Sequence, residues 1–480
     1  MATLASVDES EIDFVKRTPV HGPMRKPQSL SELDVSAAVV EDLALKTLYL
    51  VGSLSVLELA DKLKLSYSVA NEIFCRLRTE TCCQVTGMIG NVPQIAITSA
   101  GRSRAADLLT QNRYVGAAPV SFASYVAQIR TQSAQRANVH AADLNRAFQH
   151  LVVDTETLRQ LGTALNSGSS LFLYGPAGVG KTTMAEVLSR VLADDKVWIP
   201  YAIEVDGQII TVYDQTTHKG ATESDSGGHD SRWVYCQRPA VLVGGELTAE
   251  MLDLQFNTIS KFYVAPAQMK ANNGVLIIDD FGRQRLRPEE LLNRWIVPLD
   301  RKIDFLTMEG GRKIEVPFEM LVVFASNLDP AELVDPSFIR RIKTKIQIGT
   351  ISDEQFCEIF RRYAAENRVP YDPSIPRDLI GYIRFNLKQN LRSCFPRDII
   401  DQVCWAARYD DKEPYINRPA LAQAIGAYFL KGPGSSISHP ATPPPAPASP
   451  RPTYPGPASA APTSPVPSSS GPRIVGSPLN

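Results

Sequence analysis

A glycine-rich segment at residues 175–183 contains the clearest chemical signal in the chain. It reads Gly-Pro-Ala-Gly-Val-Gly-Lys-Thr-Thr and follows the apolar run Leu171–Tyr174. A buried strand, a glycine loop and a helix start, in this order, are the context in which Gly-x-x-x-x-Gly-Lys-Thr binds phosphate groups. We therefore expect this phosphate loop to bind a nucleotide. Its residues are Gly175, Pro176, Ala177, Gly178, Val179, Gly180, Lys181, Thr182 and Thr183.

Each residue type in the phosphate loop has a physical role. Gly175, Gly178 and Gly180 lack Cβ atoms, so the backbone can turn tightly and direct its N–H groups at phosphate oxygens. Lys181 supplies a positive charge for the β- and γ-phosphates, at a helix start whose dipole adds to that charge. The Thr182 hydroxyl can ligate Mg²⁺. The alternative, a glycine-rich turn with an unrelated lysine, does not explain the flanking strand and helix patterns.

Two carboxylates follow a second apolar run, at residues 275–278. A buried strand here delivers Asp279 to the crevice in which ligands bind in an open α/β sheet. An acid in this position holds Mg²⁺ in other phosphate-loop enzymes. Asp280 points the other way from the strand end and can orient or deprotonate an attacking water. A helix cap is the alternative role for such an acid, and the upstream phosphate loop disfavours it.

Three later motifs supply further polar groups. Another apolar run ends at Asn327, whose amide can hydrogen-bond the attacking water or the γ-phosphate. Arg340 and Arg341 end the segment Asp-Pro-Ser-Phe-Ile-Arg-Arg and can offer positive charge to the phosphate of a neighbouring subunit. Arg397 lies in Cys-Phe-Pro-Arg-Asp, near an expected helix start.

The chain around these motifs has the pattern of an α/β protein. Apolar strands are expected at 171–174, 197–205, 275–279 and 320–325, and they alternate with helical stretches. This alternation predicts a parallel sheet flanked by helices. Residues 352–431 are expected to be helical throughout.

The composition excludes several classes of protein. The 480 residues include 50 basic and 51 acidic side chains, so no global field favours nucleic acid or a membrane surface. We find no apolar run long enough for a membrane span and no signal-peptide pattern. The seven cysteines form no metal-binding spacing. A reducing, cytoplasmic setting is the expectation.

In order and approximate spacing, these motifs resemble the AAA+ ATPase family over about residues 144–431. The resemblance identifies the phosphate loop as Walker A and residues 275–280 as Walker B. It implies that Asn327 is sensor 1, that Arg340 or Arg341 is the arginine finger, and that Arg397 is sensor 2. Arg341 is the preferred finger, because family members place the acting arginine directly before the apolar residue.

The resemblance also implies ligands and partners. They are ATP, Mg²⁺ and further copies of the chain, commonly arranged as a hexameric ring, in which the finger acts across the subunit interface. The protein client is not identified by the sequence. An arginine supplied in trans can raise phosphoryl-transfer rates by roughly 10³–10⁵-fold, so we expect an isolated subunit to hydrolyse ATP poorly.

Two features depart from the family's core. Most relatives have Glu where this chain has Asp280, so turnover is expected to be slow, or the protein acts as an ATP-state switch. The stretch between Lys181 and Asp279 is also longer than the core needs, which predicts an insertion near 201–244. A strand-turn-strand at 305–316 contains the turn Gly310-Gly311. MoxR and dynein-related members have a substrate-contacting hairpin there, and a purely structural hairpin is the alternative.

The N-terminal part resembles a winged-helix domain. Helices are expected at 39–50, 56–63, 67–78 and 99–109, with strands at 82–86 and 94–98. Arg76 and Arg78 on the third segment can contact DNA phosphates. However, the turn at 87–93 contains no Lys or Arg. Nucleic-acid binding and protein docking both remain open.

The expected organisation therefore has six parts. They are a disordered N-terminal segment (1–35), a winged-helix-like domain (36–112), a linker (113–140), an α/β nucleotide-binding domain (141–351) with its insertion, a helical lid (352–431) and a disordered tail rich in Pro, Ala and Ser (432–480).

Three functions fit this organisation. The first is a Mg²⁺-dependent AAA+ ATPase that remodels a protein partner or complex. The second is a DNA-binding regulator whose ATPase controls its assembly, and tight duplex binding with a steep salt dependence distinguishes it. The third is an ATP-gated scaffold with little turnover, which Asp280 suggests.

Overall fold

The computed structural model describes residues 25–133, 138–193, 195–221, 228–333 and 339–429. The Pro-rich tail and most of the N-terminal segment that we expected to be disordered lie outside the described residues. None of the helices in the described ranges has both the length and the hydrophobicity that a membrane crossing requires.

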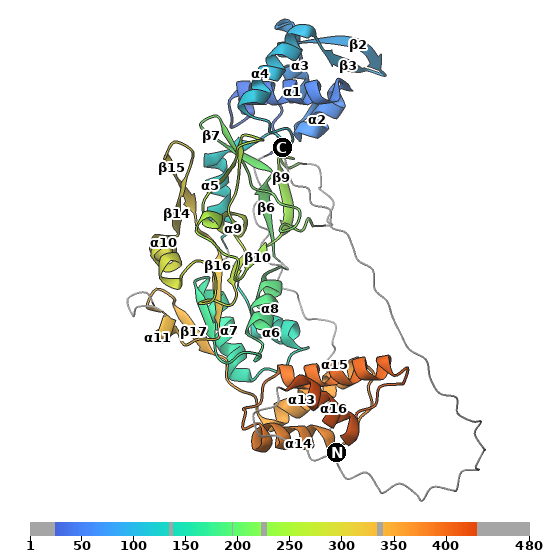
Figure 1. The fold of residues 1–480 in the computed structure, drawn as a ribbon. Coiled ribbons are helices and arrows are strands. Elements are labelled where there is room, and N and C mark those ends of the chain that lie inside the picture. The colour runs from blue at the N-terminus through green and yellow to red at the C-terminus, as the bar shows by residue number, and fades with distance from the viewer. Residues whose placement is uncertain (1–24, 134–137, 194, 222–227, 334–338, 430–480) are drawn as a thin grey trace, which may run out of the picture. The chain divides into compact units, whose positions relative to one another are not determined.

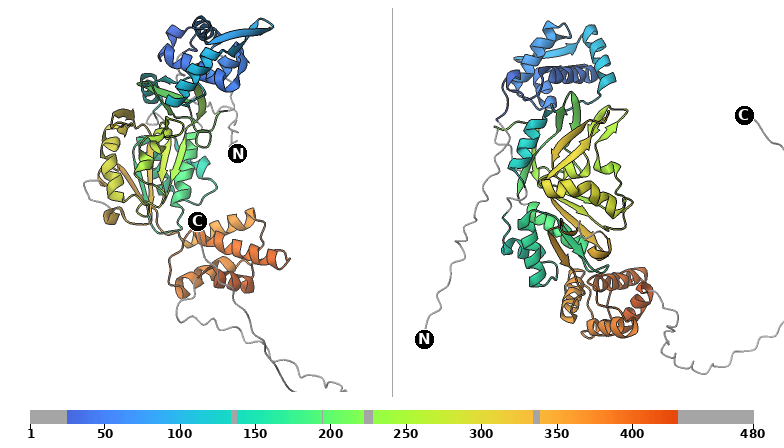
Figure 2. Two further views of the ribbon diagram at one scale, coloured as in Figure 1. Left: turned by 45° about the horizontal axis from the view of Figure 1, so that its top comes forward. Right: turned by 90° about the vertical axis from the view of Figure 1, so that its left-hand side faces the viewer.

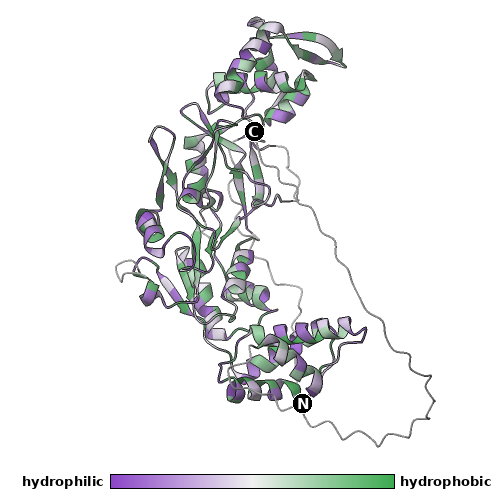
Figure 3. Ribbon diagram, in the orientation of Figure 1, coloured by the Kyte–Doolittle hydropathy of each residue, from purple (hydrophilic) through white to green (hydrophobic). Residues whose placement is uncertain are grey.

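A five-stranded parallel sheet forms the centre of the α/β part of the chain, here called the main domain (Figure 1). Its strands, in spatial order, are β10 (Ala240–Val243), β13 (Val275–Ile278), β16 (Leu321–Ser326), β5 (Leu171–Tyr174) and β17 (Thr344–Gln347). The predicted α/β fold with a parallel sheet is therefore confirmed. The strands that contribute most apolar residues, β13 and β16, are buried along their whole length. Figure 3 shows this hydrophobic character along the sheet.

Helices cover both faces of this sheet because successive strand residues point to opposite sides. Leu171 and Leu173 pack with α6 (Ala141–Phe148), α7 (Thr155–Ser167) and α8 (Lys181–Ala193). Phe172, between them, faces the other side and packs in a core that includes Trp295 of α10 (Pro288–Arg301). Phe172 also lies against Phe281 and Phe324, with ring centroids 5.8 and 6.0 Å away.

A second module, here called the insertion module, is built around another five-stranded sheet. The strands are β11 (Gln255–Asn257), β12 (Phe262–Val264), β8 (Gln208–Thr211), β7 (Ala202–Val205) and β4 (Val120–Ser121), in spatial order. Two hairpin-like pairs join its core, β6 (Lys196–Pro200) with β9 (Trp233–Gln237), and β14 (Ile303–Thr307) with β15 (Lys313–Pro317). The helices α5 (Phe122–Thr131) and α9 (Ala267–Lys270) contribute to this core, whereas the buried Leu252 of η3 (Glu250–Leu252) packs in the core of the main sheet.

Three sequence-based boundaries are corrected by this module. The expected linker supplies β4 and α5, whose Tyr125 and Ile129 are buried in the module's core. The expected strand at 197–205 is two strands of different sheets, and the break falls just after Pro200, which lacks a backbone N–H for a continuous ladder. Strand β10, which we assigned to the insertion, belongs to the main sheet.

The N-terminal elements form an α/β unit whose core also includes Ala202 and Ile209 of the insertion module. They are α1 (Ala37–Val51), β1 (Ser53–Ser55), α2 (Val56–Leu63), α3 (Tyr67–Thr79), β2 (Cys83–Ile89), β3 (Val92–Ile97) and α4 (Ser99–Gln111), with an antiparallel sheet in the order β1-β3-β2. Residues 25–35, within the segment expected to be disordered, pack on this unit. They include η1 (Leu30–Glu32), and Leu30, Leu33 and Val35 are buried in its core, because three apolar side chains are enough to anchor the segment.

The C-terminal helices have a core of their own (orange to red in Figure 2). They are α13 (Asp353–Glu366), α14 (Ile375–Gly381), the π-helical turn η4 (Tyr382–Asn386), α15 (Cys394–Tyr409) and α16 (Arg418–Tyr428). The short α11 (Pro330–Leu333) precedes them in the main domain.

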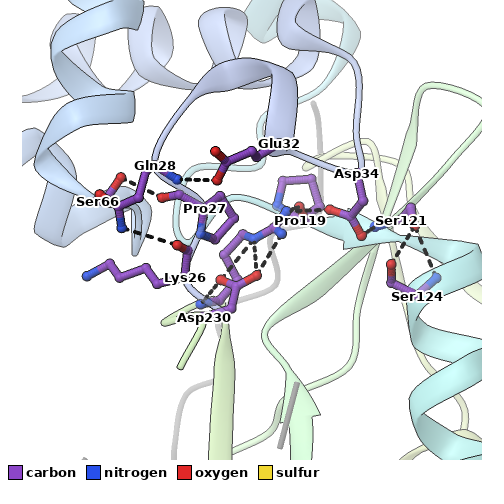
Figure 4. A network of polar contacts seen from close by, with 11 residues as sticks. Lys26, Pro27, Gln28, Glu32, Asp34, Ser66, Pro119, Ser121, Ser124 and Asp230 are labelled. Carbon is purple, nitrogen blue, oxygen red and sulfur yellow. Dashed lines mark hydrogen bonds and ion pairs between the residues drawn. The ribbon is translucent and has the colours of Figure 1, made fainter. Parts of the chain in front are cut away.

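A buried ion network attaches the N-terminal segment to the insertion module. Arg232 is only 3% exposed, and its guanidinium pairs with Asp230 at 2.7 Å and with Asp34 at 2.7 Å. It also donates to the Pro119 carbonyl, while Asp34 accepts from the Ser121 amide. Figure 4 shows Asp34, Pro119 and Asp230 gathered around one point. One buried cation thus joins three chain segments that are distant in the sequence.

We predict that Asp34→Asn lowers the free energy of unfolding by roughly 1–3 kcal/mol, because a charged hydrogen bond to the buried Arg232 is lost. Burial raises the pKa of Asp34, but the charge of Arg232 and the hydrogen bonds of Ser124 and Ser121 lower it below its usual 3.8. The stabilisation is therefore fully present above pH 3.8, the usual pKa of an aspartate, and is lost as the pH falls through the lower pKa that Asp34 has in the folded protein.

Urea unfolding at pH 7 and at stepwise lower pH measures this effect. The control is Asp61→Asn, which removes a surface pair with Lys64 in which Asp61 is 78% exposed; such pairs contribute about 0–1 kcal/mol. Equal effects of the two substitutions would contradict the anchoring role of Asp34.

Candidate functional site

The phosphate loop connects β5 to α8 in a conformation that requires glycine. Gly175, Gly178 and Gly180 have φ angles of 145°, 78° and 94°, in the region that L side chains rarely adopt. A Cβ atom on Gly175 would lie 2.1 Å from the Ile348 carbonyl oxygen, and one on Gly178 would lie 2.5 Å from the Cys394 sulfur. Backbone shape therefore favours glycine at all three positions, and lack of space adds to this at Gly175 and Gly178.

Lys181 lies at the start of α8 with its side chain folded back onto the loop. Its Nζ donates to the carbonyl oxygens of Gly175 and Pro176, at 2.9 and 2.8 Å, and to Asn327 Oδ1 at 2.7 Å. Burial lowers the pKa of Lys181, and the charges of Asp279 and Asp280 offset part of this shift. A buried ammonium held by neutral acceptors is a ready partner for an anion.

Thr182 and Asp279 form a pair of oxygen ligands. The Thr182 hydroxyl lies 2.9 Å from both carboxylate oxygens of Asp279. Asp279 directly follows β13, and its amide donates to the Val243 carbonyl at 2.8 Å, which fixes the strand end. A hydroxyl and a carboxylate side by side are the hard oxygen donors that Mg²⁺ prefers.

Asp280 has an unusual backbone for a residue with a side chain. Its φ is 49°, in the left-handed region, and its carboxylate accepts from Asn327 Nδ2 at 3.1 Å. Such conformations cost about 1–3 kcal/mol and persist where the surroundings enforce them, often at functional sites. Here the Phe281 amide bonds to the Ala325 carbonyl, and the Ser326 hydroxyl bonds to the Phe281 carbonyl.

The sheet order explains why these side chains meet. Because β5, β16 and β13 are parallel neighbours, their carboxyl ends lie at one edge. Asn327, which follows the middle strand, therefore lies between Lys181 and Asp280 and hydrogen-bonds to both. The structure brings together the loop, both carboxylates and Asn327.

A cavity of about 810 Å³ opens beside the loop. Its lining includes the predicted residues Ala177–Thr183, Asp279, Asp280, Asn327 and Arg397. Arg397 comes from α15, and its side chain pairs with Asp398 at 3.1 Å. The volume lies within the range typical of pockets for small organic ligands.

The C-terminal helices contact the phosphate loop directly. The Cys394 amide and the Ser393 hydroxyl both donate to the Gly178 carbonyl, each at 3.1 Å. From α13, Arg362 donates to the Gln149 and Leu151 carbonyls, at 2.8 and 3.3 Å. These bonds connect the helical part to both sides of the cavity.

The two candidate finger arginines lie elsewhere. Neither Arg340 nor Arg341 lines the loop cavity; both line another hollow. They lie shortly before β17 in the chain, and the hydroxyl of Ser170, the residue before β5, donates to the Arg341 carbonyl at 3.2 Å. They therefore lie at the amino edge of the parallel sheet, whereas the phosphate loop lies at its carboxyl edge.

Sequence reasoning missed part of the cavity lining. Residues 150–153, before α7, line it, as do Ile348–Ile351, which follow β17. The strand β17 reads Thr-Lys-Ile-Gln, and two of its four side chains are exposed. A short polar edge strand of this kind gives no hydrophobic run that could reveal it.

Comparisons with known proteins give limited information. A family model described as "Domain of unknown function (DUF8689)" matches residues 352–427. No curated protein matches the chain in sequence. Among solved structures, the chain is similar to the RuvB Holliday junction branch migration motor of Thermotoga maritima, with 16% identity, a TM-score of 0.34, and coverage of 57% of this chain and 69% of that one.

A point mutant of the same RuvB has 11% identity and a TM-score of 0.34, with coverage of 64% of this chain and 72% of that one. TM-scores of this size support no argument about function. The chain's own residues must therefore decide what the site does.

We predict that Lys181→Ala weakens binding of a Mg²⁺–nucleoside triphosphate by about 10–100-fold, the loss expected for one charged hydrogen-bonding partner. Isothermal titration calorimetry measures it. Lys313→Ala, an exposed lysine on β15, is the matched control. Unchanged affinity in Lys181→Ala would argue against a phosphate-binding role for the loop.

Proposed function

We propose that the chain is a Mg²⁺-dependent AAA+ ATPase that works as an oligomer and remodels a protein partner. The observation that supports it most is the convergence of Lys181, Thr182, Asp279, Asp280 and Asn327 on one glycine loop beside a cavity. Each of these side chains has the residue type and the position that one role in phosphoryl transfer requires.

The cavity suits a nucleoside triphosphate. Backbone amides of the loop and the positive end of α8 favour the phosphates. Leu151, Val153, Ile348 and Ile351 line the cavity and offer apolar contact for a base. Thr182 and Asp279 would hold Mg²⁺, which neutralises charge on the β- and γ-phosphates when it is bound.

The remaining side chains have distinct tasks in hydrolysis. A water oxygen bonds to the γ-phosphorus while the bond from that phosphorus to the bridging oxygen breaks, which yields ADP and phosphate. Asp280 orients this water and accepts its proton. Asn327 hydrogen-bonds the water or the γ-phosphate, and Lys181 stabilises the charge that develops on the phosphate oxygens. Arg397, from the lid, reports the nucleotide state to the helices.

The separation of Arg341 from the loop supports action between subunits. A strand of four residues spans about 13 Å, which is too far for an arginine at one end to reach a phosphate at the other. Arg341, or its neighbour Arg340, therefore completes the site of an adjacent copy. A closed ring, commonly of six subunits in this family, provides such a head-to-tail contact.

We predict that Arg341→Ala binds ATP normally but hydrolyses it at least about 100-fold more slowly, because a trans arginine contributes roughly 10³–10⁵-fold. Mixing it with Lys181→Ala subunits, which keep Arg341, restores part of the activity. Steady-state phosphate release measures both. Absence of restoration across mixing ratios would contradict action in trans.

Asp280 raises the alternative of an ATP-gated scaffold. It is one methylene shorter than the family's Glu, and Asn327 already holds its carboxylate. We predict measurable turnover in the wild-type chain and at most a few-fold gain in Asp280→Glu. Measuring phosphate release by the two proteins distinguishes the ATPase from the scaffold. No turnover in the wild type and a large gain in the variant would favour the scaffold.

The N-terminal unit has the element order of a winged helix, and its charges favour a protein partner over DNA. Arg76 pairs with Glu41 and Glu72, and Arg104 pairs with Asp42 and Glu80. These pairs occupy two of the arginines that could contact phosphates. The hairpin β2–β3 instead exposes Met88 and Ile89, which are 59% and 63% exposed.

The β14–β15 hairpin also fits a structural role. Leu306, Ile314 and Val316 are buried in the core of the insertion module. Phe305 on the opposite face is 42% exposed. A contact with a client would therefore use that outer face.

A further inference from the structure

A second hollow, of about 420 Å³, lies at the amino edge of the main sheet. The described residues that line it are Leu299, Asp300, Lys302, Arg340, Arg341 and Lys343, and we call it the cationic hollow. Among the described lining residues, four cationic side chains accompany one carboxylate, that of Asp300. The chain as a whole is nearly neutral, so this gathering of one sign of charge is local.

Within the part of the chain that the structure describes, Asp300 is the carboxylate of this lining, and it forms an ion pair with Arg341. Asp300 Oδ2 accepts from Arg341 Nε at 2.9 Å, and the Arg341 side chain is 19% exposed. Within the described ranges, the side chains of Lys302, Arg340 and Lys343 form no hydrogen bond or ion pair. Like charges gathered in this way repel one another unless an anion lies between them.

Lys302 is half-buried, whereas Arg340 and Lys343 are exposed. It ends α10 with a left-handed φ of 60°, which directs the chain into β14. Burial lowers the pKa of Lys302, Glu319 offsets part of this shift, and Lys343 adds to it. A desolvated lysine beside a second lysine and two arginines gains most from a multiply charged ligand.

The position of the hollow identifies where such a ligand comes from. Lys343 directly precedes β17, which runs parallel to β5. The hollow therefore lies at the opposite end of the strands from the phosphate loop of the same copy. A phosphate that enters it must belong to another molecule.

We propose that the cationic hollow receives the terminal phosphate of an ATP held by the phosphate loop of a second copy, and that Lys302 and Lys343 bind this phosphate together with Arg341. The inference rests on the ATPase function proposed above and adds two lysines to the shared site. Arginine supplies a planar fork for phosphate oxygens, and lysine supplies a point charge.

The test uses the full chain with Lys343→Gln and Lys302→Gln, singly and together. Each single substitution should lower steady-state ATP turnover about tenfold, the loss of one charge-assisted contact, and leave ATP affinity unchanged. Lys343 is exposed, so its substitution keeps the proposal testable if Lys302→Gln fails to fold. Arg301→Gln, an exposed neighbour outside the lining, is the matched control and should retain wild-type turnover.

Mixing separates this inference from the proposed function. Lys181→Ala subunits keep an intact hollow, so they should restore part of the turnover of the double lysine variant. If Arg341→Ala hydrolyses ATP slowly but the lysine variants hydrolyse it at the wild-type rate, the lysines have no role. In that case this inference is wrong, and the proposed ATPase function is unaffected. If the wild-type chain neither binds nor hydrolyses ATP, the proposed function fails as well.

Discussion

The parallel alignment of β5, β16 and β13 is the constraint on which the rest of the site depends. It places the phosphate loop, Asn327 and the two carboxylates at one edge, although they are distant in the sequence. The alternation of strand side chains between two helix-covered cores holds this alignment, because a shift by one residue would exchange the two faces. The glycines then allow the loop to approach the Ile348 carbonyl, where any Cβ would clash.

The helical part is connected to this edge by few but direct bonds. Ser393 and Cys394 donate to Gly178, a loop residue on which a Cβ atom would lie 2.5 Å from the Cys394 sulfur. Arg362 bonds to the segment before α7, on the other side of the cavity. A ligand that moves either the loop or this segment changes contacts with the helices, so occupancy of the cavity and the position of the helices are physically coupled. The buried Arg232 network plays a corresponding part at the N-terminal segment, where it joins that segment to the insertion module.

The sequence predicted the centre of the site well and its periphery poorly. Strand β5 and the loop have distinctive residue types, and β13 and β16 are uninterrupted apolar runs followed by polar residues, so each could be recognised locally. The strand β17 is short and polar, and β10 follows a proline in a stretch that looked like part of an insertion, so only tertiary pairing reveals them. The expected linker supplies β4 and α5 to a sheet whose other strands lie far along the chain, and no local pattern shows such a pairing. The cationic hollow could not be predicted for the same reason, because Lys302 and Lys343 are distant in the sequence and lie close together only in the folded chain.

The central claim is that the loop at 175–183 binds the phosphates of ATP with Mg²⁺ held by Thr182 and Asp279. A structure determined with Mg²⁺ and a non-hydrolysable ATP analogue at saturating concentration tests it most directly. The account predicts phosphate density against the loop amides and Lys181, a metal between Thr182, Asp279 and the phosphates, and Arg341 of one copy facing the terminal phosphate of the next. A loop that stays closed around Lys181 with no nucleotide beside it, or a nucleotide bound elsewhere, would contradict it.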